Sequence, residues 1–402
     1  MSEPGPMQDW GRWNPPERAP YVRDAATEPV LPPLPQRGPP PVWEQRVTGT
    51  QPLRPGMAPA AAAPPPKWGA PRRRRHWVRN SLLALLVLLL VAGGLALREV
   101  FALGQAISAQ GPLTSQTGYM LGLGRVNVLV LGYGGGAHDG ANLTDSLMVL
   151  SLDPHSGATA MVSVPRDLWV QVPPESNQYG KINTAYQVGL ANGYAGLPPG
   201  RDAGVALAAG EVSEVTGLDL PYWVTLNFTG FRSLVDALGG VDLTVPTAFT
   251  ANYPRNDDPN IDAGWKTIHF NTGRQHMDGE RAIEYARARY VLDPPSEGTD
   301  FARSARQQLL VRAIFGQARQ PGAWPRLAGA SKQLGGALYS NLSLADLALF
   351  GEKLDFNHAR RVGLTTQNVL VGATSDDGQS ILLPANDDWT AVRQYVAQQM
   401  GG

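Results

Sequence analysis

Hydrophobic and polar positions divide the chain into three regions with different patterns. Residues 1–71 show no hydrophobic period, and residues 82–97 form one apolar run without a polar face. From about residue 120 onward, short apolar runs alternate with stretches of helical period. These patterns predict a tail without a core, one membrane-type helix and a folded α/β domain.

The third region contains strand and helix signals in mixed order. Short apolar runs predict strands at residues 126–131, 146–152, 158–164, 222–226 and 241–245. Longer periodic stretches predict helices at residues 205–215, 231–238, 277–286, 301–319, 344–354 and 389–400. The second and third strands flank a turn and are expected to form a hairpin. Such a mixture predicts a central sheet covered by helices on both faces.

The N-terminal tail, residues 1–71, contains 19 of the 35 prolines of the chain. Proline at this density leaves no room for a packed core, so we expect a disordered or polyproline-like cytoplasmic segment. Five of the ten tryptophans also precede residue 80. The tail is interpreted as a spacer, with a docking segment for a cytoplasmic partner as the alternative.

A basic cluster precedes the apolar run at residues 82–97. A helix of this length rises about 24 Å, short of the ~30 Å hydrocarbon core of a bilayer. Trp77 and Arg79 at one interface and Arg98 at the other would close this gap. We therefore predict a basic stop and a single transmembrane signal-anchor helix at residues 72–100, followed by a linker at 101–120.

The flanking charges predict the orientation of this anchor. Arg72 to Arg75 and Arg79 lie before the apolar run, whereas Arg98 lies after it. By the positive-inside rule the N-terminus is cytoplasmic, which predicts a single-pass type II membrane protein. A cleavable signal peptide is disfavoured because the apolar run begins about 80 residues into the chain.

Composition and charge exclude several classes of protein. The chain has no cysteine, which excludes a disulfide scaffold, a zinc ribbon, an iron–sulfur protein and thiol chemistry. Residues 1–80 carry 12 basic and 6 acidic side chains, and residues 81–402 carry 22 basic and 28 acidic ones. An acidic folded region argues against nucleic acid as a partner, because such binding needs a basic globular face.

Two carboxylates follow the first predicted strand. Asp139 lies in a glycine-rich loop, and Asp145 lies at the start of the next strand. Such a pair can share a hard cation such as Mg²⁺ through oxygen ligands, with Mn²⁺ as an alternative. The loop lacks the spacing of a dinucleotide-binding or phosphate-binding motif. Solvated turn residues are the other interpretation of the two aspartates.

Several polar side chains with phosphate-binding chemistry lie at the ends of predicted elements. They are Arg166, Lys181, Arg287, Arg289 and Arg303, and Gln307 shares a helix face with Arg303. If the chain becomes extended after residue 286, Arg287 and Arg289 point to the same side. Paired guanidinium groups suit phosphate oxygens, so the set with a metal has the equipment for binding a pyrophosphate. Taken alone, each cluster also fits a surface ion pair or an exposed charged face of a helix.

At these residues the sequence resembles the LytR-CpsA-Psr family of cell-wall glycopolymer transferases. The resemblance runs across most of residues 125–320. It rests on VNVLVLG at 126–132, LTDSLMVLSLDP at 143–154, SVPRD at 163–167, KINTAY at 181–186, LVDALGGVDLTVP at 234–246, MDGERAIEYARAR at 277–289 and DFARSARQQ at 300–308. It implies a mixed sheet sandwiched by helices, with a long hydrophobic pocket for a polyprenyl tail. The domain is expected at 121–320, with a C-terminal extension at 321–402.

The resemblance also implies an activity and a set of site residues. Similar proteins move a glycopolymer from a polyprenyl-pyrophosphate carrier to peptidoglycan and form a phosphodiester link. By motif, the residues expected at the pyrophosphate are Arg166, Lys181, Arg287, Arg289, Arg303 and Gln307. The expected catalytic residues are Asp145, Arg166, Arg287 and Arg289, with Asp145 also binding the metal.

Two positions depart from the pattern of the family. The aspartate that often follows the first strand is replaced by Gly134, and an arginine before the second aspartate is replaced by Leu143. Asp139 is our hypothesis for the missing carboxylate of the metal site.

The expected function is a Mg²⁺-assisted phosphotransferase whose catalytic domain lies outside a bacterial plasma membrane. Positioning and electrostatics carry most of phosphoryl transfer, so a conspicuous nucleophilic residue is not required. Asp145 or Asp167 could serve as the base for the acceptor hydroxyl. One alternative is a hydrolase that cleaves the same lipid pyrophosphate with water. Another is a membrane-anchored protein that binds or regulates glycan lipids without catalysis.

Overall fold

The computed structural model describes residues 76–107, 124–136, 140–255 and 264–401. The predicted tail at 1–71 and the candidate ligand Asp139 lie outside these residues. Residue contacts divide the chain into residues 1–72 and 73–402, and every described element belongs to the second unit.

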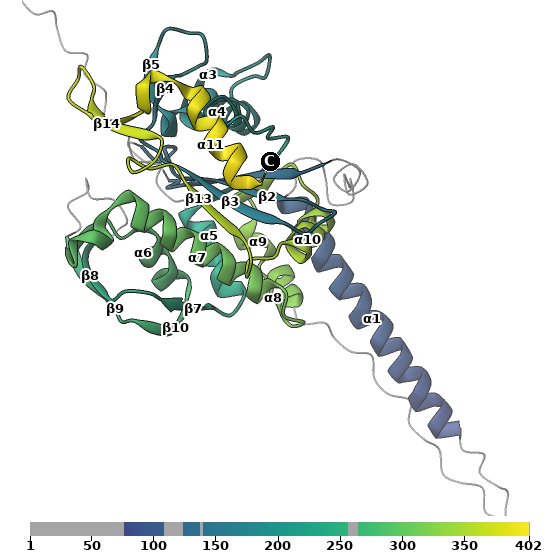
Figure 1. Cartoon of the computed structure of the whole chain (residues 1–402). Helices are drawn as coiled ribbons and strands as arrows, with labels where there is room; N and C mark the ends of the chain where they lie inside the picture. The colour runs from purple at the N-terminus through teal and green to yellow at the C-terminus, as the bar shows by residue number, and fades with distance from the viewer. Residues whose placement is uncertain (1–75, 108–123, 137–139, 256–263, 402) are drawn as a thin grey trace, which may run out of the picture. The chain divides into compact units, whose positions relative to one another are not determined.

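A six-stranded mixed sheet forms the centre of this unit (Figure 1). Its strands, in spatial order, are β12 (Leu338–Ser340), β6 (Tyr222–Asn227), β1 (Val126–Tyr133), β2 (Thr144–Leu152), β3 (Thr159–Val164) and β13 (Arg360–Gly363). β1, β2 and β3 are antiparallel neighbours, whereas β6 runs parallel to β1 and β13 runs parallel to β3. The pairing of β2 with β3 confirms the predicted hairpin.

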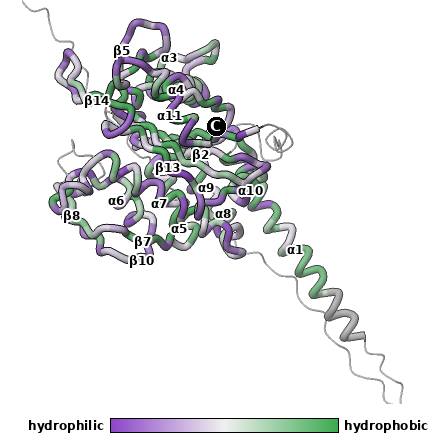
Figure 2. The backbone as a smooth tube through the Cα atoms, in the orientation of Figure 1, coloured by the Kyte–Doolittle hydropathy of each residue, from purple (hydrophilic) through white to green (hydrophobic). Residues whose placement is uncertain are grey.

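Helices cover both faces of the sheet, which confirms the predicted sandwich (Figure 1). The helices on one face are α3 (Ala185–Asn192), α4 (Arg201–Thr216) and α11 (Trp389–Met400). Those on the other are α5 (Phe228–Ala237), α7 (Asp300–Ala318) and α10 (Leu344–Lys353). Each face has its own hydrophobic core. Along β1, Leu129 belongs to the core under α3, α4 and α11, and Val128 belongs to the core on the opposite face, as strand alternation requires. Figure 2 shows hydrophobic central strands between these layers.

Two smaller sheets pack with α6 (Gly279–Arg287) and α7 around a third hydrophobic core. One pairs β7 (Val241–Val245) with β10 (Gly273–Met277), and the other has the order β11 (Tyr290–Asp293), β8 (Phe249–Pro254), β9 (Trp265–Phe270). The remaining elements are β4 (Trp169–Gln171), β5 (Tyr179–Lys181), η1 (Ile182–Thr184), η2 (Pro295–Gly298), α8 (Ala323–Gly329), α9 (Ser331–Leu334), β14 (Leu370–Thr374), β15 (Ser380–Pro384) and η3 (Ala385–Asp387). Of the β7–β11 strands, only β7 was predicted.

The helix α1 (His76–Ile107) is longer than the sequence predicted. The expected linker at 101–120 is wrong over residues 101–107, because these residues continue the helix. Leu103 and Ile107 are buried in a cluster with residues of α8 and α9, and this packing stabilises the last turns. Residues Ala84–Ile107 are long and apolar enough to cross a membrane, judged by length and composition.

Two further boundaries differ from the expectations. Met277 ends β10, and α6 begins only after Asp278, whose carboxylate accepts a hydrogen bond from the backbone nitrogen of Arg281 as an N-cap. Residues 321–402, expected as an extension, supply both edge strands of the central sheet, β12 and β13. The structure therefore builds this region into the sheet.

Candidate active site

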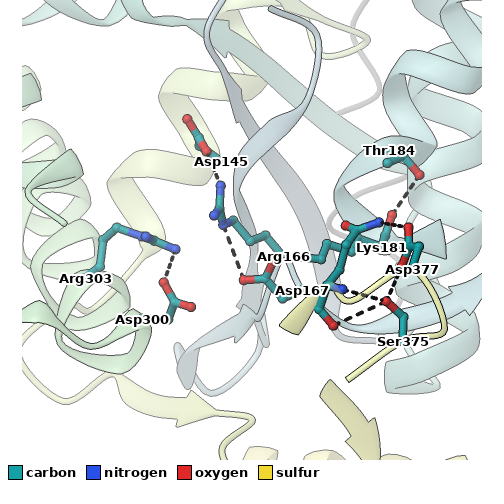
Figure 3. Close-up of polar contacts among 10 residues, drawn as sticks. Asp145, Arg166, Asp167, Lys181, Thr184, Asp300, Arg303, Ser375 and Asp377 are labelled. Atoms are coloured by element: carbon teal, nitrogen blue, oxygen red, sulfur yellow. Dashed lines mark hydrogen bonds and ion pairs between the residues drawn. The ribbon is translucent and has the colours of Figure 1, made fainter. Parts of the chain in front are cut away.

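The ends of two central strands bring Asp145 and Arg166 together. Asp145 lies at the start of β2, and Arg166 follows the end of β3. Because β2 and β3 are antiparallel, these two ends lie side by side. Arg166 Nη1 donates a hydrogen bond to Asp145 Oδ1 at 2.8 Å. Figure 3 shows Arg166 between Asp145 and Asp167.

Asp167 links Arg166 to Lys181. Lys181 Nζ lies 2.8 Å from Asp167 Oδ1, and Arg166 Nε lies 3.5 Å from Asp167 Oδ2. Burial by itself would raise the pKa of Asp167, but the charges of Arg166 and Lys181 outweigh it and lower the pKa. Asp167 therefore stays ionised at neutral pH, and its low basicity makes it a poor general base.

The end of α6 presents the Arg-x-Arg pair. The helix ends at Arg287, and Ala288 leaves the helical conformation with φ −50° and ψ 114°. Arg287 and Arg289 consequently line the same pocket, in the arrangement expected if the chain becomes extended there.

Aromatic side chains hold Arg287 in place. Its Nη1 donates to the hydroxyl of Tyr253 at 2.9 Å, and its guanidinium lies 3.7 Å from the ring centroid of Phe228. Its Nε lies 3.9 Å from Asp145 Oδ2. This cation–π and hydrogen-bond support fixes the guanidinium toward the pocket.

Arg289 has different surroundings. Its side chain is exposed, and within the described residues it makes no hydrogen bond or ion pair. Its guanidinium donors are therefore available to a ligand in the pocket.

Arg303 and Gln307 lie one turn apart on the same face of α7 and line the same pocket. Arg303 is 8% exposed, and its Nη2 lies 2.5 Å from Asp300 Oδ1. Burial lowers the pKa of Arg303 to about 10, although Asp300 opposes the shift, so the side chain remains cationic at neutral pH. Gln307 Oε1 accepts a hydrogen bond from Ser146 at 3.0 Å.

These groups converge on a small pocket of about 50 Å³. Its lining residues are Asp145, Asn252, Tyr253, Pro254, Arg287, Arg289, Tyr290, Arg303 and Gln307. Of the described candidates, Arg166 and Lys181 do not line it. Arg166 reaches it through Asp145, and Lys181 reaches Arg166 through Asp167.

A much larger apolar cavity of about 740 Å³ adjoins this pocket. Hydrophobic side chains of β1, β2, β6, α5, α7 and α10 line it, and Leu103 and Ile107 of α1 complete one part of the wall. Asp145, Arg287 and Gln307 line both the pocket and the cavity, so the two spaces meet at these side chains. The arrangement suits a ligand with a phosphate head and a long apolar tail.

The donor set at the pocket fits a metal ion shared with a ligand. Among the described residues, no group of three or more His, Cys, Asp or Glu side chains could hold a metal by itself. Mg²⁺ commonly uses one or two carboxylates together with substrate phosphates and water. Asp145, which lines the pocket, supplies such a carboxylate.

Sequence reasoning missed the supporting role of Arg306. This side chain is 2% exposed; its Nε donates to Tyr285 O at 3.0 Å and its Nη2 donates to Ala288 O at 2.7 Å. Its Nη1 donates to Glu297 O at 2.7 Å. Arg306 therefore fixes the bend that presents the Arg-x-Arg pair. Arg306 lies only three residues after Arg303 in the sequence. That spacing does not show which of the two arginines lines the pocket and which supports the backbone.

Comparison with known proteins gives a consistent result. The LytR_cpsA_psr family model matches residues 105–396. A protein of Bacillus mycoides (strain KBAB4) named polyisoprenyl-teichoic acid–peptidoglycan teichoic acid transferase TagU is 30% identical over 190 residues, which cover 47% of this chain and 51% of that protein. The corresponding transferase TagV of Bacillus subtilis (strain 168) is 31% identical over 173 residues, covering 43% and 38%. The chain thus spans about half, or less, of the length of these relatives.

Two solved structures share the fold. The crystal structure of B. subtilis TagV aligns with a TM-score of 0.51 and 22% identity, covering 69% of this chain and 97% of that one. A Streptococcus agalactiae protein aligns with a TM-score of 0.53 and 20% identity, covering 71% and 91%. At this level of identity the likeness concerns the fold alone.

Proposed function

Because this chain belongs to the LytR_cpsA_psr family, we propose that it transfers a glycopolymer from a polyprenyl-pyrophosphate carrier to peptidoglycan. The observation that carries the proposal is the junction at Asp145, Arg287 and Gln307 between the cationic pocket and the apolar cavity. A lipid pyrophosphate needs both spaces in contact, because its charged head and apolar tail are joined by one bond. The names of the relatives TagU and TagV describe a transfer of teichoic acid to peptidoglycan, which is a reaction of the same class.

The proposed reaction is a displacement at phosphorus. An acceptor hydroxyl attacks the phosphorus bonded to the glycan, a new oxygen–phosphorus bond forms, and the bridging bond to the second phosphorus breaks. Polyprenyl phosphate leaves, and the glycan becomes joined to peptidoglycan by a phosphodiester. The hydroxyl proton passes to a base, for which we propose Asp145, because Asp145 lines the pocket and Asp167 does not.

The cationic side chains would bind and orient the pyrophosphate. Arg287, Arg289 and Arg303 face the pocket from two elements and would balance the charge on the phosphate oxygens. Arg166 would act on Asp145 instead and hold its carboxylate in position, because it donates a 2.8 Å hydrogen bond to Asp145. Lys181 would keep Asp167, and through it Arg166, in position.

A divalent ion is a further part of the proposal. Asp145 would hold Mg²⁺, or Mn²⁺, together with the pyrophosphate oxygens, and Asp139 remains the proposed second carboxylate. Such an ion supplies charge neutralisation at the phosphates.

We also propose that α1 anchors the domain outside a bacterial plasma membrane with the N-terminus in the cytoplasm. The charge asymmetry around the apolar run supports this orientation. Leu103 and Ile107 at the end of α1 line the cavity, so the lipid tail and the anchor would share one wall.

The test uses the full chain in detergent micelles with a synthetic polyprenyl-pyrophosphate glycan. Reactions contain or lack Mg²⁺ and a peptidoglycan acceptor, and mass spectrometry measures polyprenyl phosphate and the joined product. We expect product only when both are present. Release of lipid phosphate without acceptor would instead indicate a hydrolase, and a bound but unchanged donor would indicate a binding protein.

A further inference from the structure

The exposed face of the three-stranded sheet β11–β8–β9 carries an aromatic pair beside the phosphate pocket. The rings of Trp265 on β9 and Tyr290 on β11 form a T-shaped contact with centroids 4.7 Å apart, across the intervening strand β8. Trp265 is 43% exposed, and Tyr290 is 47% exposed. Leu292, two residues further along β11, is 55% exposed. Exposed apolar side chains that lie together in this way indicate an interaction surface.

Polar side chains continue the same face. Thr267 Oγ1 donates to Asn252 Oδ1 at 3.2 Å, and the Thr250 hydroxyl lies 2.8 Å from His269 Nδ1. The strand register places Asn252 between Tyr290 and Thr267. The face therefore combines aromatic rings with amide, hydroxyl and imidazole groups.

The position of this face connects it with the reaction. Tyr290 and Asn252 line the small phosphate pocket but not the apolar cavity. In phosphoryl transfer the attacking and leaving oxygens are roughly in line. If the lipid phosphate leaves toward the cavity, the attacking hydroxyl approaches from the side that Tyr290 and Asn252 border.

We propose that the face formed by Trp265, Tyr290, Asn252 and Thr267 binds a pyranose ring of a glycan. A sugar presents apolar C–H faces, which an aromatic ring covers, and equatorial hydroxyls, which amides and hydroxyls bind. The inference rests on the proposed function for its biological meaning. The in-line geometry assigns the face to the accepting glycan rather than to the transferred one.

Binding is tested first, without any reaction. The full chain in detergent is titrated by calorimetry with a tetrasaccharide of alternating N-acetylglucosamine and N-acetylmuramic acid, and separately with farnesyl pyrophosphate. Trp265→Ala and Tyr290→Ala should each weaken tetrasaccharide binding roughly fivefold. Trp265→Ala should leave farnesyl pyrophosphate binding unchanged, because Trp265 does not line the phosphate pocket. Trp265→Phe should retain most of the affinity.

Tyr179→Ala is the matched control, because Tyr179 is 58% exposed and lies on β5 outside this face. It should bind the tetrasaccharide as the wild type does. Unchanged binding by Trp265→Ala and Tyr290→Ala, equal losses in Tyr179→Ala, or no binding by the wild type would each overturn the inference. Thermal melting of every variant excludes unfolding as the cause of a loss.

A kinetic arm distinguishes the source of the sugar. A rise in KM for the acceptor in Trp265→Ala would support the accepting glycan, and a rise in KM for the donor would support the transferred one. If the wild type binds the tetrasaccharide through Trp265 but transfers nothing, the glycan site stands and the proposed transferase function fails. If it transfers normally and Trp265→Ala changes neither KM, the glycan site fails and the function stands.

Discussion

Arginine side chains on the two sides of Ala288 have different surroundings. On the buried side of Ala288, Arg306 is almost fully buried and donates to the carbonyls of Tyr285, Ala288 and Glu297. On the pocket side, Arg289 is exposed and makes no hydrogen bond or ion pair within the described part of the chain. Arginine therefore has two roles here. Where backbone carbonyls accept from its donors it stabilises the bend, and where its donors are left for a ligand it forms part of the binding pocket.

The two sides also differ in electrostatics. Arg306 lies 3.1 Å from Glu297 Oε2, which compensates its buried charge. Arg303, three residues earlier on α7, has Asp300 as a partner but also faces Arg166 and Arg289, which lower its pKa further. Concentrated positive charge in the pocket is unfavourable without an anion, so bound phosphate is expected to stabilise the protein.

The largest effect on stability is expected from Arg306→Ala. The variant leaves three backbone carbonyls and the Glu297 carboxylate without their buried donor, which costs about 3–5 kcal/mol of unfolding free energy. Urea unfolding followed by circular dichroism measures the change. Arg312→Ala is the matched control on the same helix, because Arg312 donates to Asn357 in an exposed bond. Equal stability of the two variants would contradict the structural role of Arg306.

Substitution of Arg289, on the pocket side, should affect activity and leave stability unchanged. Arg289→Ala should reduce the transfer rate by about 10²–10³-fold, the range for loss of one preorganised donor, with an unchanged melting temperature. Arg289→Lys should recover part of the rate, because the charge remains while the fork is lost. A large fall in melting temperature for Arg289→Ala would place Arg289 with Arg306 instead.

A third buried ionisable side chain differs from both arginines because no cation among the described residues pairs with it. Glu211 of α4 is 1% exposed, and its Oε1 accepts no hydrogen bond from the described residues. Burial, with a smaller contribution from Glu214, raises the pKa of Glu211 from 4.5 to about 8. Between these values the folded state holds a proton that the unfolded state has lost, so stability falls as pH rises and is lowest above about pH 8.

Glu211→Gln should therefore be more stable than the wild type above pH 8, by about 1–3 kcal/mol, and nearly equal to it near pH 4. Thermal melting across pH 4–9 measures the difference. Glu214→Gln is the control, because Glu214 is exposed and pairs with Arg393. If Glu211→Gln gives the same pH dependence as the wild type, Glu211 is ionised in the folded protein.

The smallest effect concerns the apolar cavity. Ala348 of α10 lines it away from the pocket, and Ala348→Phe would fill part of the space. We expect a roughly tenfold loss of transfer with a long polyprenyl donor and little loss with a farnesyl donor, because overfilling costs about 1–3 kcal/mol only where the tail must fit. Equal losses with both donors would show that the cavity does not hold the tail.

The central sheet could be predicted from the sequence because its strands are apolar runs. The strand predicted at 241–245 agrees with β7 in both bounds, and the hairpin of β2 with β3 follows from its turn. The strands β8, β9 and β11 escaped prediction, since they mix buried and exposed residues in short segments and depend on one another for pairing.

The site could be predicted in its members but not in their division of work. Motifs named Asp145, Arg287, Arg289, Arg303 and Gln307, and the structure brings them to one pocket. Whether an arginine contacts the pocket or its support depends on burial and partners, which spacing does not reveal. Aromatic partners such as Tyr253 escaped for the same reason, because they come from a strand distant in sequence.

The most direct test of the central claim follows one phosphorus atom. A donor labelled with ³²P only in the phosphate bonded to the glycan is incubated with the full chain, Mg²⁺ and peptidoglycan. We expect label in peptidoglycan, in a bond that resists phosphatase, and release of unlabelled polyprenyl phosphate. Label released as a soluble glycan phosphate, or retained on the lipid, would contradict the account.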